Sequence, residues 1–193
     1  MNEAIVKDCL TKMLTEGLGL DLKDPNLSET PDRIARMYCQ EFFSGISNSN
    51  PLKLKAFPND KGFDEIVMLD NIPFVSMCSH HFLPFPGLAW FLYIPDNKLV
   101  GASKPSRAIE FFAKQPQLQE NLSSQVIDHF MEEIKPKGAM LVMRAVHGCM
   151  SCRGVKTGNN SGMITSITRG NFRDNLSTRM EAMSLIQLSL SFK

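Results

Sequence analysis

Cysteine and histidine are concentrated in two short segments that lie far apart in the chain. Residues 76–87 read SMCSHHFLPFPG and residues 146–154 read VHGCMSCRG, and together they hold three of the four histidines and three of the five cysteines. Thiolates and imidazoles are the ligands that zinc prefers in tetrahedral sites. If one metal ion takes ligands from both segments, the fold must bring them side by side, and this requirement constrains the chain more than any other feature.

The number of ligands decides what kind of metal site these segments can form. Cys78 and His81 are three residues apart, so they share a face only if the backbone turns between them, which the prolines and glycine that follow favour. With Cys149 as the third ligand, the metal keeps an open position, as in a catalytic zinc site that binds and acidifies a water. With Cys152 as a fourth ligand, the CxxC spacing gives a closed structural site. A core with scattered reduced cysteines is the third interpretation, and spacing alone leaves all three open.

Four further polar residues, two of them within these segments, are candidates for substrate chemistry. If the open site forms, His80 and His147 are spare imidazoles that can donate or accept protons near neutral pH. Gln119 and Glu120 stand at the start of a predicted helix. A carboxylate there usually complements the helix dipole, although it could also accept paired hydrogen bonds from a guanine-like N–H edge.

A second candidate site lies at the start of another predicted helix, in the sequence GASKPSRAIEFFA at 101–113. Ser103 is a suitable N-cap, and Lys104 and Arg107 are three residues apart on one face. Backbone N–H groups, a hydroxyl and two cations suit a phosphate chain, to which Arg153 could add a third cation. A solvated helix end explains the same residues, and the sequence alone favours that explanation.

Composition limits the partners and the location that we expect. The formal net charge is +1, which gives no general attraction for nucleic acid or for a membrane. No apolar run is long enough to span a bilayer, and the N-terminal stretch MNEAIVKDCLTKML lacks the features of a signal peptide. We therefore expect a cytoplasmic protein with reduced cysteines, in which Cys9 and Cys39 are buried.

Hydrophobic periodicity predicts an α+β fold. Four segments have helical spacing, namely residues 3–16, 27–45, 104–114 and 117–135. Four segments read as strands or strand pairs, namely residues 63–78, 88–103, 138–150 and 162–172. Residues 177–190 fit either a helix or a strand. This order indicates two helices packed on one face of a mostly antiparallel sheet, with an N-terminal helical region and linker over residues 1–62 and a catalytic domain over residues 63–193.

Four ordered stretches resemble the motifs of the GTP cyclohydrolase I family, the zinc enzymes that make dihydroneopterin triphosphate from GTP. SMCSHHFLPFPG is similar to that family's SMCEHHxxPFxG, GASKPSRAIEFFAKQPQLQENL to its GLSKxxRxVxxxxxRxQxQExL, and VHGCMSCRGVK to its xHxCMxxRGV. LSETPDRIARMYCQEFFSG resembles its N-terminal helix. The resemblance runs from about residue 28 to residue 181, and four motifs in matching order are far more specific than one.

The resemblance implies a role for each candidate residue. It implies that Cys78, His81 and Cys149 bind zinc, that His80 and His147 are the acid–base pair, and that Cys152 is a bystander. The residues implied to hold GTP are Ser103, Lys104, Arg107 and Arg153 at the triphosphate, and Gln119 and Glu120 at the guanine.

The resemblance also implies a fold, an assembly and a reaction. The fold is the tunnelling fold, and the chain self-associates into a homo-oligomer, usually a decamer of two stacked pentamers with sites between subunits. The reaction hydrolyses the guanine ring of GTP at C8, releases formate and rearranges the remainder to 7,8-dihydroneopterin triphosphate, as in tetrahydrofolate and pterin biosynthesis.

One position departs from the family pattern. Ser79 stands where the motif usually has Glu, which removes a charge and a hydrogen-bond acceptor beside the candidate ligands. This departure keeps an alternative open, in which the chain is a non-catalytic relative such as a regulatory subunit, or an enzyme that acts on another purine nucleotide.

Overall fold

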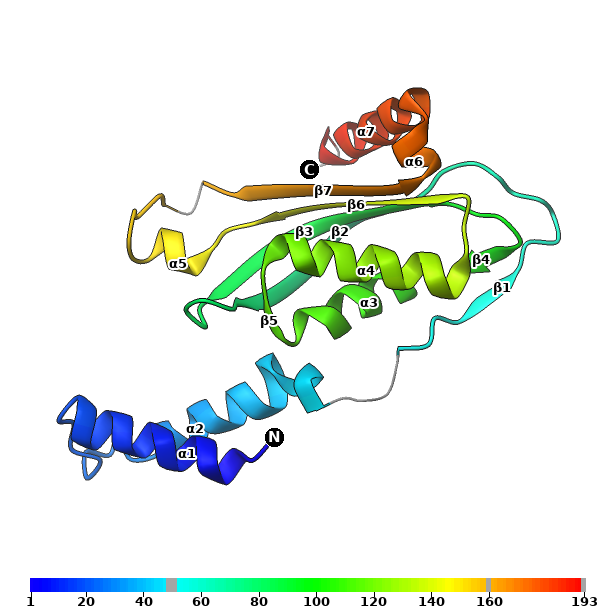
Figure 1. Ribbon diagram of the computed structural model, residues 1–193. Coiled ribbons are helices and arrows are strands. Elements are labelled where there is room, and N and C mark those ends of the chain that lie inside the picture. The colour runs from blue at the N-terminus through cyan, green and yellow to red at the C-terminus, as the bar shows by residue number, and fades with distance from the viewer. Residues whose placement is uncertain (48–51, 159–160, 192–193) are drawn as a thin grey trace. The chain divides into compact units, whose positions relative to one another are not determined.

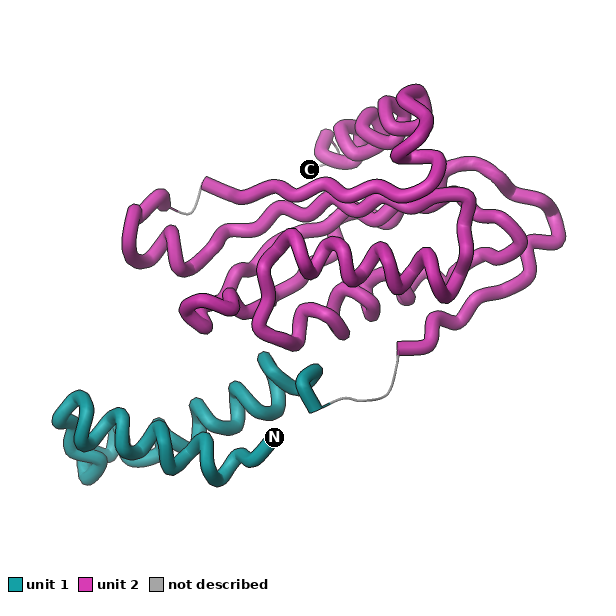
Figure 2. The backbone as a smooth tube through the Cα atoms, viewed as in Figure 1, with its two compact units in different colours: residues 1–50 teal, residues 51–193 magenta. Residues whose placement is uncertain are grey.

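The computed structural model describes residues 1–47, 52–158 and 161–191, and the chain forms two compact units. Met1–Asn50 make up the first unit and Pro51–Lys193 the second (Figure 2). The segment 52–62, which the sequence pattern placed with the N-terminal region, lies in the second unit. This segment contains strand β1 (Ala56–Pro58), which pairs with β4 (Lys98–Val100) of the second unit in a small antiparallel sheet.

The first unit is a pair of helices. Helix α1 (Glu3–Lys12) continues into the π-helical segment η1 (Met13–Gly17), and α2 (Thr30–Arg36) continues into η2 (Met37–Phe42), followed by the short 3-10 helix η3 (Ser44–Ser47). The Asn2 side chain caps α1 by accepting a hydrogen bond from the Ile5 N–H at 3.2 Å. Lys7 and Asp32 join the two helices through an ion pair of 2.7 Å.

The two cysteines of the first unit are less buried than the sequence pattern indicated. Cys9 is exposed and Cys39 is half-buried, so the expectation of two buried thiols was wrong. A pair of helices buries only one narrow stripe on each member, and that stripe holds Leu14, Ala35 and Phe43 instead.

A five-stranded sheet organises the second unit. Its order is β5-β2-β3-β6-β7, and every neighbouring pair is antiparallel except β2 and β5. The strands are β2 (Val67–Cys78), β3 (Pro84–Ile94), β5 (Pro116–Gln117), β6 (Gly138–Ala145) and β7 (Met163–Gly170). Helices and a mostly antiparallel sheet share one chain, which confirms the α+β class.

Helices α3 (Lys104–Ala113) and α4 (Gln119–Ile134) cover one face of this sheet (Figure 1). Side chains alternate along each strand, so every second residue of β3 points toward these helices. Phe85, Ala89 and Phe91 enter the main core this way, together with Phe130 of α4, and all four are fully buried.

Two further helices, α6 (Asn171–Asp174) and α7 (Leu176–Ser191), lie on the opposite face (Figure 1). Residues 177–190, which fit either element by sequence, are therefore helical. Trp90 and Leu92, which alternate with the residues of the first face, pack here with Ala182 and Ile186 of α7. The Trp90 Nε1–H donates to the Ser189 Oγ at 3.0 Å, so the buried indole nitrogen has a partner.

The strand predicted over residues 138–150 ends earlier than its apolar run indicated. Strand β6 stops at Ala145, the last residue paired with β7, and the short helix α5 (Gly148–Ser151) follows. The inference that His147 and Cys149 share one face of a strand was therefore wrong in its local structure. None of the helices that the structure describes is long and apolar enough to cross a membrane.

Candidate metal centre

The turn between β2 and β3 brings Cys78 and His81 together. Cys78 is the last residue of β2, and its N–H and C=O groups bond to the Leu83 C=O and the Phe82 N–H at 2.9 Å each. Phe82 adopts a φ of 50°, the left-handed conformation that closes this tight reversal. Because the chain reverses within a few residues, Cys78 and His81 project to the same side, as the motif required.

Helix α5 supplies the third side chain of the group. After β6 ends, the Val146 N–H donates to the Pro86 C=O at 3.0 Å, which keeps this segment against the start of β3. Gly148 then packs against the Pro84 carbonyl, where an added Cβ would lie only 2.8 Å from that oxygen. The close approach of the backbones carries Cys149 to the β2–β3 turn.

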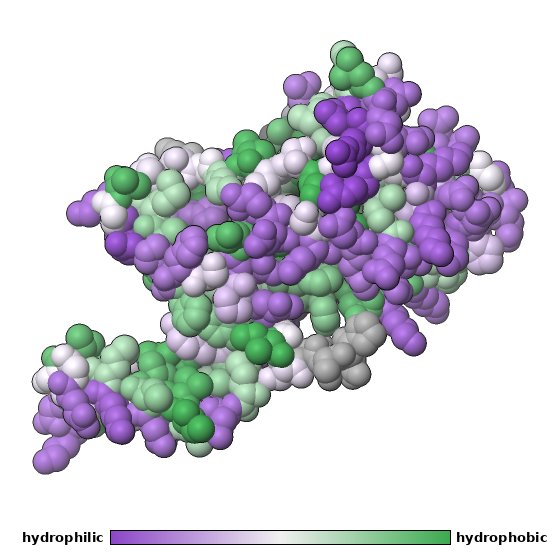
Figure 3. All heavy atoms as spheres, in the orientation of Figure 1, coloured by the Kyte–Doolittle hydropathy of each residue, from purple (hydrophilic) through white to green (hydrophobic). Residues whose placement is uncertain are grey.

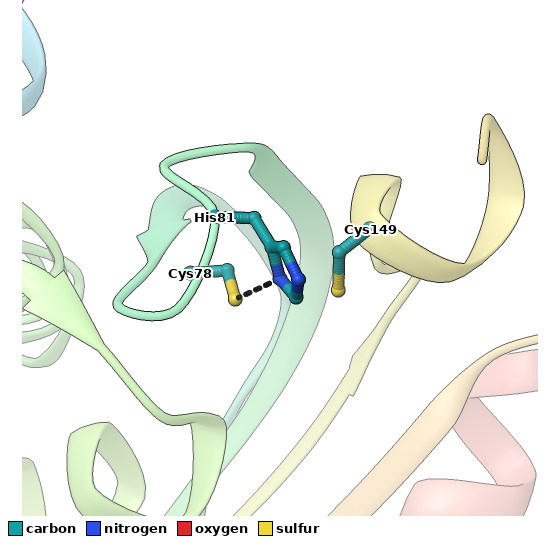
Figure 4. Close-up of side chains that lie close together, drawn as sticks. All are labelled: Cys78, His81 and Cys149. Carbon is teal, nitrogen blue, oxygen red and sulfur yellow. Dashed lines mark hydrogen bonds between the residues drawn. The ribbon is translucent and has the colours of Figure 1, made fainter. Parts of the chain in front are cut away.

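Cys78, His81 and Cys149 form a group that could hold one metal ion. Their three donor atoms lie within 4.8 Å of one another, and the Cys78 Sγ is 3.9 Å from the His81 Nδ1 (Figure 4). Burial and the adjacent Cys78 sulfur raise the pKa of the Cys149 thiol. The positive charge of the Arg153 guanidinium acts in the opposite direction and lowers this pKa. Two sulfurs and one imidazole at this spacing match the donor set of a three-ligand zinc site, whose cation would offset the repulsion between the thiolates.

Cys152 is not part of this group. Its thiol donates instead to the Gly148 C=O at 2.7 Å, and it is exposed. Within residues 1–47, 52–158 and 161–191, no second cluster of cysteine, histidine or carboxylate side chains has metal-binding spacing. The arrangement therefore favours three protein ligands over the closed four-ligand site.

His147 lies beside the group and is held on two sides. Its ring stacks on Phe85, with centroids 4.6 Å apart and planes 3° from parallel, and its Nε2 is 2.9 Å from the Gln119 Oε1. Partial burial lowers the pKa of His147, and the nearby Glu120 carboxylate opposes that shift. The neutral imidazole is therefore favoured at neutral pH, which suits a group that exchanges protons.

Gln119 and Glu120 are adjacent in sequence, but their side chains are placed differently. Gln119 is fully buried, whereas Glu120 is exposed. His80 is also exposed, and its ring contacts that of His81 edge to face at a centroid distance of 6.2 Å.

The candidate phosphate-binding residues of α3 lie away from the metal-binding group of the same chain. Helix α3 ends at Ala113, just before β5, where Gln117 pairs with Cys78. Ser103, Lys104 and Arg107 stand at the other end of α3, which has 10 residues and is therefore about 15 Å long. One chain thus does not bring these cations next to its own Cys–His–Cys group.

Sequence reasoning missed three residues of the site. Phe85 stacks on His147, while Thr165 and Ser123 form hydrogen bonds with Gln119. The Phe85 position lies within the quoted motif, but nothing in its pattern distinguishes a stacking ring from a core ring. Thr165 belongs to the strand MITSITRG, in which polar and apolar residues do not alternate regularly, so the sequence carried no signal that this side chain points inward.

A thiol–imidazole–thiol group that could hold a metal ion, close in sequence to a partly buried histidine on an α+β sheet, is the arrangement expected of a metal-dependent enzyme. Comparison with known proteins then gives the family. The family model described as GTP cyclohydrolase I matches residues 7–187, so the chain belongs to the GTP cyclohydrolase I family.

Similar proteins match along nearly the whole chain. "GTP cyclohydrolase 1" of Carboxydothermus hydrogenoformans is 45% identical over 176 residues, which cover 91% of this chain and 90% of that protein. "GTP cyclohydrolase 1" of Clostridium kluyveri is 42% identical over 188 residues, covering 97% and 100%. A solved structure described as the archaeosine synthase QueF-Like in the apo form covers 55% of this chain at 12% identity and a TM-score of 0.43, a likeness too weak to assign the fold.

Proposed function

We propose that the protein hydrolyses GTP and rearranges it to 7,8-dihydroneopterin triphosphate, with release of formate. Membership of the GTP cyclohydrolase I family over residues 7–187 carries this conclusion. The chain is accordingly a GTP cyclohydrolase, a hydrolase of folate and pterin biosynthesis. A cytoplasmic location stays a prediction from the composition.

The metal that we propose is zinc, held by Cys78, His81 and Cys149. The donor set supports it, because two sulfurs and one imidazole within 4.8 Å suit that ion. A zinc ion with three protein ligands would supply Lewis acidity and an acidified water. The protein's part is to fix the three donors on a tight turn and a short helix that contact each other.

His147 and His80 are the groups that we propose for proton transfer. His147 is the better supported of the two, because stacking on Phe85 and a hydrogen bond to Gln119 hold its ring. His80 is exposed at the turn and is free to contact a substrate that approaches from solvent. We propose that the Glu120 carboxylate accepts hydrogen bonds from the guanine N–H edge. The proposed role of Gln119 at the guanine is then indirect, because its side chain is buried.

We propose that the triphosphate binds the Ser103 hydroxyl and three cations, Lys104, Arg107 and Arg153. Since α3 starts about one helix length from the metal-binding group, we propose that the α3 residues serve the site of a neighbouring subunit. Strong anchoring of the phosphates would hold the reacting ring in place, so guanosine should be a poor substrate.

Self-association in the manner of a tunnelling fold is part of the proposal, with a decamer as the expected assembly. Two sheet edges support it in the part of the chain that the structure describes. Among the described residues, no strand pairs with the outer edge of β7, and β5 pairs with the outer edge of β2 only at Met77 and Cys78. Hydrophobic residues also cover much of the visible surface of the first unit (Figure 3), and its exposed apolar side chains include Ile5, Met13, Leu18 and Ile46.

Zinc content and formate release, measured on the same sample, test this function. We expect the purified protein to contain zinc and, when incubated with GTP, to release formate and develop pterin fluorescence. Cys149→Ala should lose both zinc and activity, because it removes one of three ligands. The matched control is Cys152→Ala, which should retain both.

Two results would contradict the proposal. Loss of zinc from Cys152→Ala would show a closed four-ligand site instead of an open one. A zinc-loaded protein that releases no formate at high enzyme concentration would be a non-catalytic relative, in line with the Ser79 departure.

A further inference from the structure

The Gln119 side chain occupies an unusual position for the first residue of a helix. Side chains in the first turn usually face solvent, but Gln119 is fully buried between α4 and the strands β6 and β7. A buried amide must satisfy its donors and acceptor within the protein. The partners that it finds fix which way the amide points.

The amide nitrogen of Gln119 faces a group of acceptors. The Nε2 lies 3.1 Å from the Met143 C=O, 3.3 Å from the Met163 C=O and 3.1 Å from the Thr165 Oγ1. Carbonyl oxygens only accept hydrogen bonds, so the reversed amide would set its own oxygen against two others. The network therefore assigns the nitrogen to this side.

Ser123 reinforces this assignment. Its Oγ–H donates to the Gln119 C=O at 2.8 Å, and its Oγ is 3.0 Å from the Thr165 Oγ1. Because the Ser123 hydroxyl hydrogen is already donated to the backbone, the Thr165 hydroxyl is the donor in the contact between Ser123 and Thr165. Its oxygen then remains an acceptor for the Gln119 Nε2–H.

The amide oxygen of Gln119 consequently faces His147. The Gln119 Oε1 is an acceptor only, so the His147 Nε2, at 2.9 Å, must carry the hydrogen. A neutral imidazole has one ring hydrogen, which leaves the His147 Nδ1 with a free lone pair. No partner for that Nδ1 occurs among the residues that the structure describes, and Phe85 restrains the ring by stacking on it.

We propose that Gln119 is a positioning residue that fixes the His147 ring in the Nε2–H tautomer, which leaves Nδ1 as the ring nitrogen that can face a substrate. This inference rests on the proposed function for the identity of the reaction, but its tautomer can be tested without turnover. The Nε2 hydrogen stays on His147, because the amide oxygen is far too weak a base to take it.

Nuclear magnetic resonance of the histidine rings tests the tautomer directly. The full-length protein as purified, labelled with ¹³C and ¹⁵N in its four histidines, is suited to solid-state spectra, which do not depend on assembly size. His147→Asn identifies the His147 signals by their absence. We expect a hydrogen on Nε2, directed at the Gln119 Oε1, and an Nε2 without a hydrogen would overturn the proposal.

A pair of glutamine variants tests the positioning role. Gln119→Leu should leave His147 without a preferred tautomer and lower kcat by about 10- to 100-fold, with a much smaller change in KM. The matched control is Gln117→Leu, because Gln117 is also buried but bonds to the Phe112 C=O and the Gln125 Oε1 instead. This control should keep the Nε2–H tautomer and most of the kcat.

The outcomes separate the two proposals. If Gln119→Leu does not fold, Thr165→Val removes one acceptor from the same amide with little change in shape, and should weaken the tautomer preference. If His147 has the Nε2–H tautomer but the protein does not turn over GTP, the proposed function is contradicted and the positioning role of Gln119 remains supported. If the protein turns over GTP fully with an Nδ1–H tautomer, only the positioning role is contradicted. The same holds if a folded Gln119→Leu has an unchanged kcat.

Discussion

Gly148 shows how one small residue controls the distance between the two metal-binding segments. It lies between His147 and Cys149, and a Cβ at this position would approach the Pro84 carbonyl oxygen to 2.8 Å. That oxygen is part of the backbone at the start of β3, so it cannot move aside as a flexible side chain could. An alanine would push α5 away from the β2–β3 turn and take Cys149 with it.

We therefore predict that Gly148→Ala weakens zinc binding by about 10- to 100-fold, as is typical when the support of a metal ligand is disturbed. Competition with a chromogenic chelator measures that affinity. Gly17→Ala is the control, because an added Cβ there meets nothing within 4 Å. An unchanged affinity in Gly148→Ala would mean that Cys149 does not depend on this backbone contact.

At the same scale, sequence reasoning could identify the candidate metal ligands that the fold brings together, but not the residues that hold them in place. Cysteine and histidine are rare residue types, so Cys78, His81 and Cys149 stand out in a chain with five cysteines and four histidines. The contact between Gln119 and His147 joins residues 28 positions apart and depends on the tertiary packing of α4 against β6. Nothing local to Gln119 indicates that its side chain points inward.

At the scale of elements, α7 illustrates why one helix could not be distinguished from a strand. Its sequence, LSTRMEAMSLIQLSLS, carries apolar residues on every side and alternates polar and apolar residues near its end. Ala182 and Ile186 face the sheet and are buried, whereas Met180 and Leu188 are exposed. The helical period is visible only once the buried residues are known.

The two sides of α7 should respond differently to truncation of a side chain. We predict that Ile186→Ala lowers the free energy of unfolding by about 2–5 kcal/mol, because it leaves a cavity against the sheet. Leu188→Ala, at a position 53% exposed, should change it by less than about 0.5 kcal/mol. Denaturant unfolding at one fixed protein concentration compares them, and equal losses would show that the outer side of α7 is also packed.

The end of β6 was a boundary that the sequence did not reveal. Residues 138–150 are apolar almost throughout, so they read as one continuous strand. The strand ends at Ala145 because its pairing with β3 and β7 ends there. Strand ends depend on partner strands, which periodicity within a single segment cannot specify.

At the scale of the whole molecule, the two candidate halves of the site lie at different ends of α3. Cys78 pairs with β5, which follows the C-terminal end of α3, whereas Lys104 is the first residue of that helix. Each site therefore requires a metal-binding group from one chain and α3 cations from another, if the chains assemble as we propose. A decamer of chains of 21.6 kDa would have a mass of 10 × 21.6 = 216 kDa, which sedimentation can measure.

Mixing two inactive variants tests whether subunits share a site. Cys149→Ala lacks a proposed metal ligand, and Lys104→Glu reverses the charge of a proposed phosphate contact, so each should be inactive alone. If the chains are unfolded, mixed in equal amounts and refolded together, random assembly gives about a quarter of the sites an intact ligand set and an intact cation. We expect GTP turnover to return to a corresponding fraction of the native value. If both residues served the same site from the same chain, no mixed assembly could contain an intact site, and the mixture would remain inactive.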